Sequence, residues 1–205
     1  MVATKKIRIA VLVSGGGTNL GALIKAQTDG VLADGEISLV ISSRADAYAL
    51  TRAENAGIAH CVVEKKALGS QEAFESAIIA KLEENGIELI VLAGFMSILS
   101  ENFTSRYPER IINVHPSLIP AFCGKGFYGL RVHEAALDYG VKVTGATVHF
   151  VNEIPDGGRI IMQRAVDIRD DDTPETLQRR VMENAEWIIL PLSVQKVCAD
   201  MCKNG

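Results

Sequence analysis

Residues 7–20 read IRIAVLVSGGGTNL, a mostly apolar run followed directly by three glycines and a polar turn. The run is rich in β-branched residues, which favour a buried strand. Glycines at the junction of a strand and a helix let backbone N–H groups converge on an anion at the helix N-terminus. The stretch therefore predicts a strand over residues 7–13 that leads into an anion-binding turn.

The spacing of these glycines narrows the class of anion. Gly15, Gly17 and Gly21 do not fit the G-x-G-x-x-G pattern of dinucleotide sites, and no lysine follows a glycine as it does in a Walker A loop. The turn therefore favours a single phosphate monoester over a dinucleotide or a triphosphate. A tight turn that only begins a helix explains the same residues and stays open as an alternative.

Similar apolar runs recur along the chain and indicate the fold class. They cover residues 37–41, 58–63, 87–92, 111–114, 143–151 and 160–168. Between the earlier runs lie stretches with a helical spacing of apolar residues, such as 45–56 and 71–84. Strands that alternate with helices predict an α/β fold with a mostly parallel sheet, flanked by helices on both faces.

The later part of the chain departs from this alternation. Residues 152–159, between the last two runs, are too few for a crossover helix, so those two strands are predicted to be antiparallel neighbours. Thr173 and Pro174 form a helix-start signal, an N-cap residue followed by a proline at the first helical position. A long helical region is expected over residues 173–202, with a bend near Pro191.

Length, charge and hydropathy limit the class of protein. The 205 residues carry 21 Lys and Arg against 25 Asp and Glu, a formal net charge of −4, and 48% are hydrophobic. These values are typical of one globular domain over residues 1–205. No basic cluster offers the positive face that nucleic acid requires, and no window approaches the roughly 18 apolar residues of a membrane span. We expect small-molecule partners, no nucleic acid or membrane, and a monomer or homodimer.

The N-terminus and the cysteines both indicate a cytoplasmic protein. Residues 1–12 lack the long apolar stretch and the cleavage site of a signal peptide. The four cysteines are too few and too scattered for a disulfide framework, which favours a reducing compartment. Cys198 and Cys202 lie one helical turn apart, but no cluster completes a ligand set, so they are interpreted as thiols and no metal is predicted.

Two polar residues mark the end of the predicted strand near residue 114. Asn113 and His115 are two residues apart, so they project from the same face of the strand, and Pro116 ends it. Ligands of open α/β sheets bind at this carboxyl edge. An amide that can bond an oxyanion, beside an imidazole that can carry a proton, is a sensible pair for acyl transfer. A purely structural role for His115 remains the alternative.

Asp156 precedes Gly157 and Gly158 in the connection between the last two strands. One interpretation is a plain turn, in which the carboxylate bonds its own backbone. The other is an acid held near His115, where it would raise the pKa of the imidazole and orient the ring. Composition does not choose between them.

Weaker candidates receive structural interpretations. His60 and His149 lie in apolar runs and are interpreted as core or edge histidines, and His133, near the start of a predicted helix over 129–138, as a cap or a solvent-facing residue. The aspartates at 170–172 are interpreted as a solvated loop. Residues 121–129, which are rich in glycine, form a loop that is either mobile or functional.

Five motifs in order give the chain a family resemblance. They are residues 14–20, LAGFMSIL at 92–99, NVHPSL at 113–118, HFV at 149–151 and DGG at 156–158. Together they resemble the phosphoribosylglycinamide formyltransferases, the folate-dependent enzymes of purine synthesis, over about residues 7–192. The resemblance implies one doubly wound domain that transfers the formyl group of 10-formyltetrahydrofolate to the amine of N1-(5-phospho-D-ribosyl)glycinamide, without a metal.

The resemblance also implies site residues. The catalytic set falls on Asn113, His115 and Asp156. The ribonucleotide contacts fall on Gly17, Thr18, Asn19, Gly94, Pro116 and Glu186. The formyl-folate contacts fall on Met96, Ser97, Ile98, Leu99, Asn113, Val151, Asn152, Glu153 and Ile154.

Two departures from the family pattern accompany the resemblance. Gln71 stands where some members carry an arginine that contacts the folate, so a charge pair to the glutamate tail is in doubt. The loop at 121–129 looks longer than in many members. Formyltetrahydrofolate hydrolases and initiator-tRNA formyltransferases share the chemistry but add a further domain, and we expect neither here. A non-catalytic phosphosugar-binding module would keep residues 14–20 without needing the catalytic three to meet.

Overall fold

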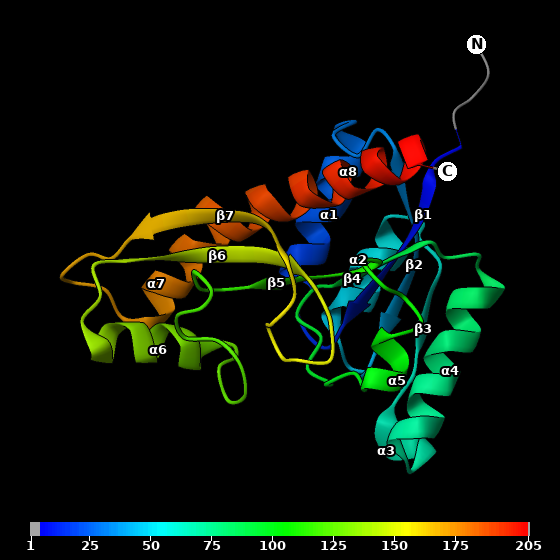
Figure 1. The fold of residues 1–205 in the computed structure, drawn as a ribbon, viewed down its shortest axis with the longest axis horizontal. Helices are drawn as coiled ribbons and strands as arrows, with labels where there is room; N and C mark the ends of the chain where they lie inside the picture. The colour runs from blue at the N-terminus through cyan, green and yellow to red at the C-terminus, as the bar shows by residue number, and fades with distance from the viewer. Residues whose placement is uncertain (1–4, 205) are drawn as a thin grey trace.

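A seven-stranded sheet in the order β3-β2-β1-β4-β5-β6-β7 runs through the residues that the computed structural model describes, 5–204 (Figure 1). The strands are β1 (Ile7–Val13), β2 (Gly35–Ser42), β3 (His60–Val62), β4 (Leu89–Leu92), β5 (Ile111–His115), β6 (Val143–Phe150) and β7 (Ile160–Asp167). All seven predicted runs form strands. The two ends of the predicted 1–205 domain, including the first four residues of the segment tested as a signal peptide, lie outside the described residues.

The first five strands run parallel, and the late strands pair antiparallel, as the sequence predicts. β1, β2, β3, β4 and β5 are parallel to their neighbours, whereas β6 pairs antiparallel with both β5 and β7. The mostly parallel sheet and the antiparallel late pair are therefore confirmed. The order of the strands reverses between β1 and β4, and ligands of doubly wound sheets bind at such a switch point.

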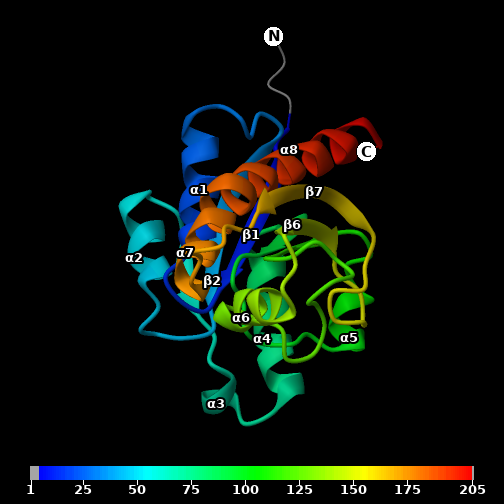
Figure 2. The same ribbon diagram turned by 90° about the vertical axis from the view of Figure 1, so that its left-hand side faces the viewer.

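Eight α-helices and one π-helical segment lie among the described residues. They are α1 (Thr18–Thr28), α2 (Tyr48–Asn55), α3 (Lys65–Leu68), α4 (Gln71–Glu84), α5 (Glu101–Thr104), α6 (Leu130–Tyr139), α7 (Pro174–Val181), the π-helix Met182–Glu186 and α8 (Trp187–Asn204). α1 and α8 lie side by side on one face of the sheet, and α4 and α5 lie on the other (Figures 1 and 2).

Alternation along β1 divides the buried residues into two cores. Ile9, Val11 and Val13 face the core under α1 and α8, whereas Ala10 and Leu12 face the core under α4 and α5. Successive side chains of a strand point to opposite faces, so a central strand covered on both faces must be apolar throughout. This explains why residues 9–13 show no polar alternation.

The C-terminal helical region begins as expected and contains a π-helical segment. Thr173 and Thr176 form a capping box, with Pro174 at the first helical position, so the predicted start is confirmed. Pro191 lies inside α8, near its beginning, and the helix continues past it. The departure from α geometry is the π-helix Met182–Glu186, which lies upstream of Pro191. Such π segments widen a turn and frequently occur at functional sites.

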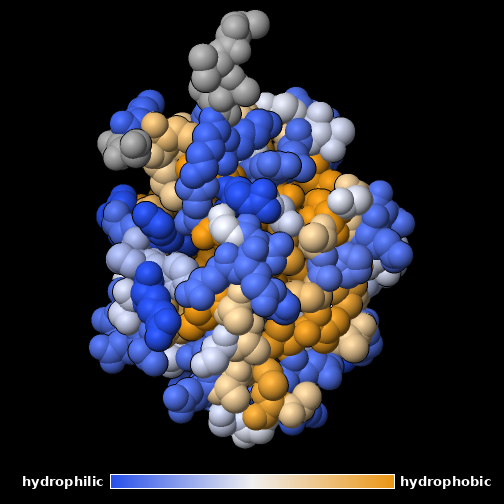
Figure 3. All heavy atoms as spheres, turned by 90° about the vertical axis from the view of Figure 1, so that its right-hand side faces the viewer, coloured by the Kyte–Doolittle hydropathy of each residue, from blue (hydrophilic) through white to orange (hydrophobic). Residues whose placement is uncertain are grey.

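The side of the molecule that carries α4 is mixed in character. Hydrophilic residues cover most of it, with apolar area exposed between them (Figure 3). Leu68 on α3 and Val62 on β3 are among the exposed large apolar residues of the protein. No helix within residues 5–204 is both long and apolar enough to cross a membrane.

Phe74 anchors α4 to the sheet. It is fully buried, and its ring stacks on that of Phe95 with centroids 6.3 Å apart. We predict that Phe74→Ala lowers the free energy of unfolding by about 3–5 kcal/mol, because the substitution removes a large apolar side chain and leaves a cavity. Urea unfolding measures this change. Tyr139→Ala, at a site that is 80% exposed, is the control and should change stability by less than about 0.5 kcal/mol. Equal losses in both variants would contradict this packing.

Candidate active site

The carboxyl ends of β1, β4 and β5 meet at a cavity of about 630 Å³. Its lining includes most of the residues that the sequence singled out, namely Asn19, Gly94, Met96, Ser97, Ile98, Asn113, His115, Pro116, Asp156 and Glu186. A smaller cavity of about 130 Å³ shares Asn113 and Asp156 with it and is lined by the other predicted folate contacts, Leu99, Val151, Asn152, Glu153 and Ile154. Gly17 and Thr18 lie at the start of α1, outside both linings.

Asp156 lies beside His115, as the second interpretation of the DGG motif requires. Its Oδ2 is 3.5 Å from His115 Nδ1 and accepts a hydrogen bond of 2.8 Å from the backbone N–H of Gly124. On the other edge of the ring, His115 Nε2 is 2.9 Å from the carbonyl oxygen of Phe122. A carbonyl can only accept, so Nε2 carries a proton, and in the neutral ring Nδ1 is free to take another.

The loop that carries Asp156 depends on glycine. Asp156 itself has a positive φ of 56°, a conformation that few residues other than glycine adopt. A Cβ on Gly158 would overlap the carbonyl oxygen of Phe150, so the loop can return against the end of β6 only with glycine there. The paired glycines therefore bring the preceding carboxylate to the sheet edge.

His149 belongs to the site, although the sequence interpretation made it a core or edge histidine. The ring is buried on β6 directly opposite Asn113, and its Nε2 lies 3.2 Å from Asn113 Nδ2 and 3.6 Å from Asp156 Oδ1. Its Nδ1–H donates to the carbonyl of Phe150 at 2.8 Å. Because an amide nitrogen can only donate, Nε2 accepts a hydrogen bond from the Asn113 amide, which fixes that amide and leaves its second N–H free.

Burial and charge act in opposite directions on the catalytic pair. Burial lowers the pKa of His115 below its ordinary value, and this outweighs the nearby Asp156 carboxylate, which raises it. The sequence expectation of a raised His115 pKa is therefore wrong in its net direction. Burial raises the pKa of Asp156, but His149, His115 and the Gly124 N–H together lower it below its ordinary value. A carboxylate beside a neutral imidazole is the resulting state at neutral pH.

A second polar pair joins α1 to the π-helix. Asn19 Nδ2 donates to Glu186 Oε2 at 2.7 Å, and both side chains are buried. Burial raises the pKa of Glu186 to about 7, against the hydrogen bond from Asn19, which lowers it. Asn19 Oδ1 is buried without a partner. The free acceptor Oδ1 of Asn19 and the Glu186 carboxyl group, whose pKa is about 7, together suit a ligand with hydroxyl groups.

The turn before α1 presents backbone donors to the same region. Gly17 has a φ of 67°, and a Cβ there would lie 2.7 Å from the Cβ of Ala49, so only glycine fits. No side chain caps the helix, which leaves its first N–H groups available to an anion. Arg52 Nε donates to the carbonyl of Gly16 at 2.9 Å and holds the turn.

Ser14 links this turn to the segment that follows β4. Its buried hydroxyl accepts a hydrogen bond of 2.9 Å from the backbone N–H of Met96 and lies 2.7 Å from the hydroxyl of Ser43. A hydrogen bond therefore links the turn before α1, the predicted phosphate site, to the segment of predicted folate contacts after β4. Sequence reasoning missed this contact because Ser14 and Met96 are far apart along the chain.

Two of the weaker candidates were interpreted wrongly. His133 neither caps a helix nor faces solvent, because it is fully buried on α6, lines the large cavity and has no hydrogen-bond partner on either ring nitrogen. The loop at 170–172 is only partly solvated, because Arg180 covers the carboxylate of Asp172 and lowers its pKa to about 2, whereas Asp170 is exposed. Cys198 is a buried free thiol, and no group of three His, Cys, Asp or Glu residues within the described part of the chain could hold a metal ion.

Comparisons with known proteins agree with this arrangement. A family model described as formyl transferase matches residues 7–193. The chain is 41% identical to phosphoribosylglycinamide formyltransferase of Haemophilus influenzae, over 92% of this chain and 85% of that protein. It is similar in fold to glycinamide ribonucleotide transformylase 1 from Symbiobacterium toebii, with a TM-score of 0.89 and 41% identity over 95% of this chain and 89% of that one.

A longer relative matches as well. The chain is 45% identical to the trifunctional purine biosynthetic protein adenosine-3 of Gallus gallus over 100% of its own length. It spans about a fifth of the length of that protein and of the corresponding human and bovine proteins.

The burial of His133 makes a prediction about stability and pH. Burial, with a smaller effect of the neighbouring His115, lowers the pKa of His133 from 6.5 to about 4. The unfolded chain then takes up a proton first, so stability is greatest above pH 6.5 and falls as the pH decreases toward 4. We predict that His133→Leu removes about 2 kcal/mol of the stability difference between pH 7 and pH 5. Urea unfolding at both pH values tests this, with the exposed His60→Leu as control. The same pH dependence in His133→Leu as in the unaltered protein would contradict it.

Proposed function

Because the chain belongs to the formyl transferase family, we propose that it transfers the formyl group of 10-formyltetrahydrofolate to the primary amine of N1-(5-phospho-D-ribosyl)glycinamide, a step of purine synthesis. The names of its relatives support this reaction. The single observation that carries the proposal most directly is the meeting of Asn113, His115 and Asp156 in one cavity beside the start of α1.

The ribonucleotide is proposed to lie between α1 and the π-helix. Its phosphate would accept hydrogen bonds from the backbone N–H groups at Gly17, Thr18 and Asn19, where no side chain caps the helix. Its ribose hydroxyl groups would meet Glu186 and the unpaired Oδ1 of Asn19. This places the glycinamide amine toward the Asn113 end of the cavity.

The formyl donor is proposed to bind against the segment after β4 and the loop after β6. Met96, Ile98 and Ile154 are large apolar residues that remain 57%, 69% and 58% exposed around the two cavities. Exposed apolar side chains at the mouth of a cavity favour a flat aromatic ligand, such as the ring systems of a folate.

The amine then attacks the formyl carbon, and an oxyanion develops on the formyl oxygen. The free N–H of Asn113, held in place by His149, donates to that oxygen, and one such donor contributes roughly a hundredfold or more to the rate. His115 takes a proton from the attacking nitrogen, and the resulting imidazolium is stabilised by the Asp156 carboxylate. The new C–N bond remains, the bond from carbon to N10 of the folate breaks, and the proton passes from His115 or through water to N10.

Small molecules suffice as partners for this reaction. All four cysteines are free thiols, which supports the proposal that the protein works in a reducing compartment such as the cytoplasm.

His115 and Asp156 should matter for turnover rather than for ribonucleotide binding. We predict that His115→Ala and Asp156→Asn each lower kcat by at least about a hundredfold and change the KM of the ribonucleotide only a few fold, because neither side chain is among the proposed phosphate and ribose contacts. Steady-state rates of folate release measure both values. Unchanged turnover in either variant would rule out the mechanism. Consumption of the formyl donor without the ribonucleotide would indicate a hydrolase instead.

Asn19 should matter for ribonucleotide binding rather than for turnover. We predict that Asn19→Ala raises the KM of the ribonucleotide about tenfold and leaves that of the donor unchanged, because the substitution removes one contact of the ribose and a partner of Glu186. Thr28→Ala, at the other end of α1, is the matched control, since its hydroxyl bonds only the carbonyl of Ile24. A rise confined to the KM of the donor would contradict the placement of the nucleotide.

A further inference from the structure

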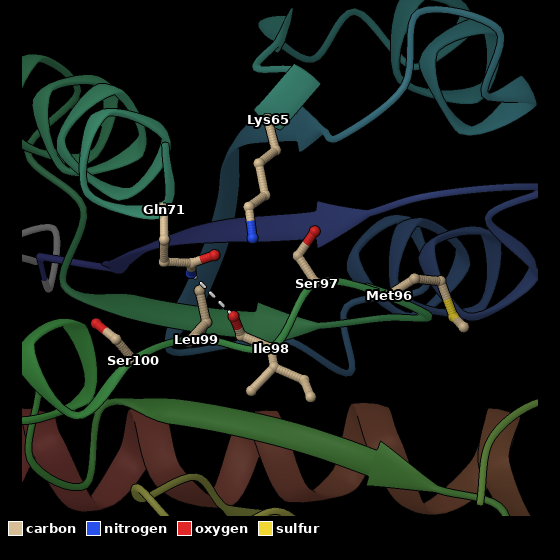
Figure 4. Close-up of a pocket in the computed structure, with 7 residues that line it drawn as sticks. All are labelled: Lys65, Gln71, Met96, Ser97, Ile98, Leu99 and Ser100. Carbon is tan, nitrogen blue, oxygen red and sulfur yellow. Dashed lines mark hydrogen bonds between the residues drawn. The ribbon is translucent and has the colours of Figure 1, made fainter. Parts of the chain in front are cut away.

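Three polar residues lie abreast on the last three strands of the sheet. His115 of β5 pairs with Thr147 of β6, and Thr147 pairs with Gln163 of β7. Residues that are paired in this way point to the same face of a sheet. Thr147 and Gln163 line neither of the two active-site cavities, nor the groove between α3 and the segment after β4 (Figure 4). An influence of these two residues on the reaction must therefore pass through His115 or the chain around it.

The hydroxyl group of Thr147 holds the turn at residues 117–122, which follows β5. Thr147 is fully buried, and its Oγ1 donates a hydrogen bond of 2.7 Å to the carbonyl of Ser117. The same oxygen accepts hydrogen bonds from the backbone N–H of Ile119 at 3.1 Å and from Nε2 of Gln163 at 2.9 Å. A hydroxyl group donates once and accepts twice, so its full capacity is used here.

Gln163 holds the same turn from the surface of the protein. Its Nε2 donates to the carbonyl of Ile119 at 3.0 Å as well as to Thr147, so both hydrogens of the amide are used at this turn. The side chain of Gln163 is exposed, whereas Thr147 and Ser117 are fully buried. The turn is thereby fixed from both of the strands that follow β5 in the sheet.

The far end of the turn meets the imidazole of His115. Ser117 Oγ donates to the carbonyl of Ala121 at 2.6 Å, and the next carbonyl, that of Phe122, lies 2.9 Å from His115 Nε2. Phe122 has a positive φ of 49°, which a bulky residue adopts only where its surroundings hold it. The direction of the Phe122 carbonyl therefore depends on the hydrogen bonds that fix the turn.

This carbonyl determines which nitrogen of the neutral His115 ring carries the proton. With the carbonyl in place the proton is on Nε2, and Nδ1, which lies 3.5 Å from Asp156 Oδ2, is left as the base. If the carbonyl turned away, the proton would move to Nδ1, where the Asp156 carboxylate accepts it. Nδ1 could then no longer take a proton from a substrate.

We propose that Thr147 and Gln163 are positioning residues for formyl transfer, which hold the Phe122 carbonyl on His115 Nε2 and so keep Nδ1 free to accept the proton of the attacking amine. The inference rests on the proposed function, because it concerns the base of the same reaction. It extends the site outward from the cavity to the edge strand β7.

The first test compares two variants of Thr147. Thr147→Val removes the hydroxyl group and keeps the branched shape, whereas Thr147→Ser keeps the hydroxyl group. We expect Thr147→Val to lower kcat about tenfold and to change the KM of either substrate by less than about twofold, because the base is misdirected while the substrate contacts remain. Thr147→Ser should retain most of the rate. An unchanged kcat in Thr147→Val, an equal loss in Thr147→Ser, or a change confined to a KM would overturn the inference.

Gln163→Leu tests the same hydrogen bonds at an exposed position, and it decides the question if Thr147→Val does not fold. We expect it to lower kcat about threefold, because Thr147 still holds part of the turn. Arg164→Leu is the matched control, since its side chain points to the other face of β7, and it should match the unaltered enzyme. Equal kcat values in the two leucine variants would contradict the role of Gln163.

The tautomer of His115 can be measured without turnover. Nitrogen NMR of the ring, at a pH where it is neutral, should place the proton on Nε2 in the unaltered protein and in Thr147→Ser. In Thr147→Val and Gln163→Leu a larger share should lie on Nδ1. The same tautomer in all four proteins would overturn the inference. If the unaltered enzyme transfers no formyl group, the proposed function fails, whereas the tautomer measurement still tests whether Thr147 and Gln163 position His115.

Discussion

The carboxylate of Asp156 lies between two buried imidazoles, and the rest of the site is arranged around it. His115 comes from β5, His149 from β6, and the N–H that holds the carboxylate comes from Gly124 in the loop after β5. A buried carboxylate needs polar neighbours that offset the loss of its hydration, and the Gly124 N–H is the donor at hydrogen-bond distance here. The position of Asp156 therefore couples two strands and two loops, and displacing any of these elements changes the protonation of the others.

The topology of the sheet explains why two substrates can meet at this place. The strand order reverses between β1 and β4, so the loops after these strands diverge and leave a crevice at their carboxyl ends. The turn after β1 offers backbone donors for a phosphate, and the segment after β4 offers apolar side chains for a ring system. Ser14 ties the two together through the N–H of Met96, and the antiparallel pair β6 and β7 closes the far side with the loop that carries Asp156.

Local patterns in the sequence predicted the strands and the face shared by Asn113 and His115, because each depends on spacing along a single segment. The residues around Asp156 left its proximity to His115 open, and only the family resemblance implied it, because the two residues lie on different segments. His149 could not be assigned in this way, since its place opposite Asn113 depends on the register between β5 and β6. The burial of His133 depends on how α6 packs in the folded chain, and the lowered pKa of His115 depends on how deeply the ring is covered. The spacing of residues along the sequence does not show how deeply His133 or His115 is buried.

The central claim is that Asp156 acts electrostatically on a neutral, buried His115, and an NMR titration of the His115 ring nitrogens tests it most directly. The account predicts that the pKa of His115 lies below 6.5 in the unaltered protein and falls further in Asp156→Asn, because the remaining influence of burial is then no longer opposed by the carboxylate. A pKa of His115 above 6.5, or one that the substitution leaves unchanged, would contradict it.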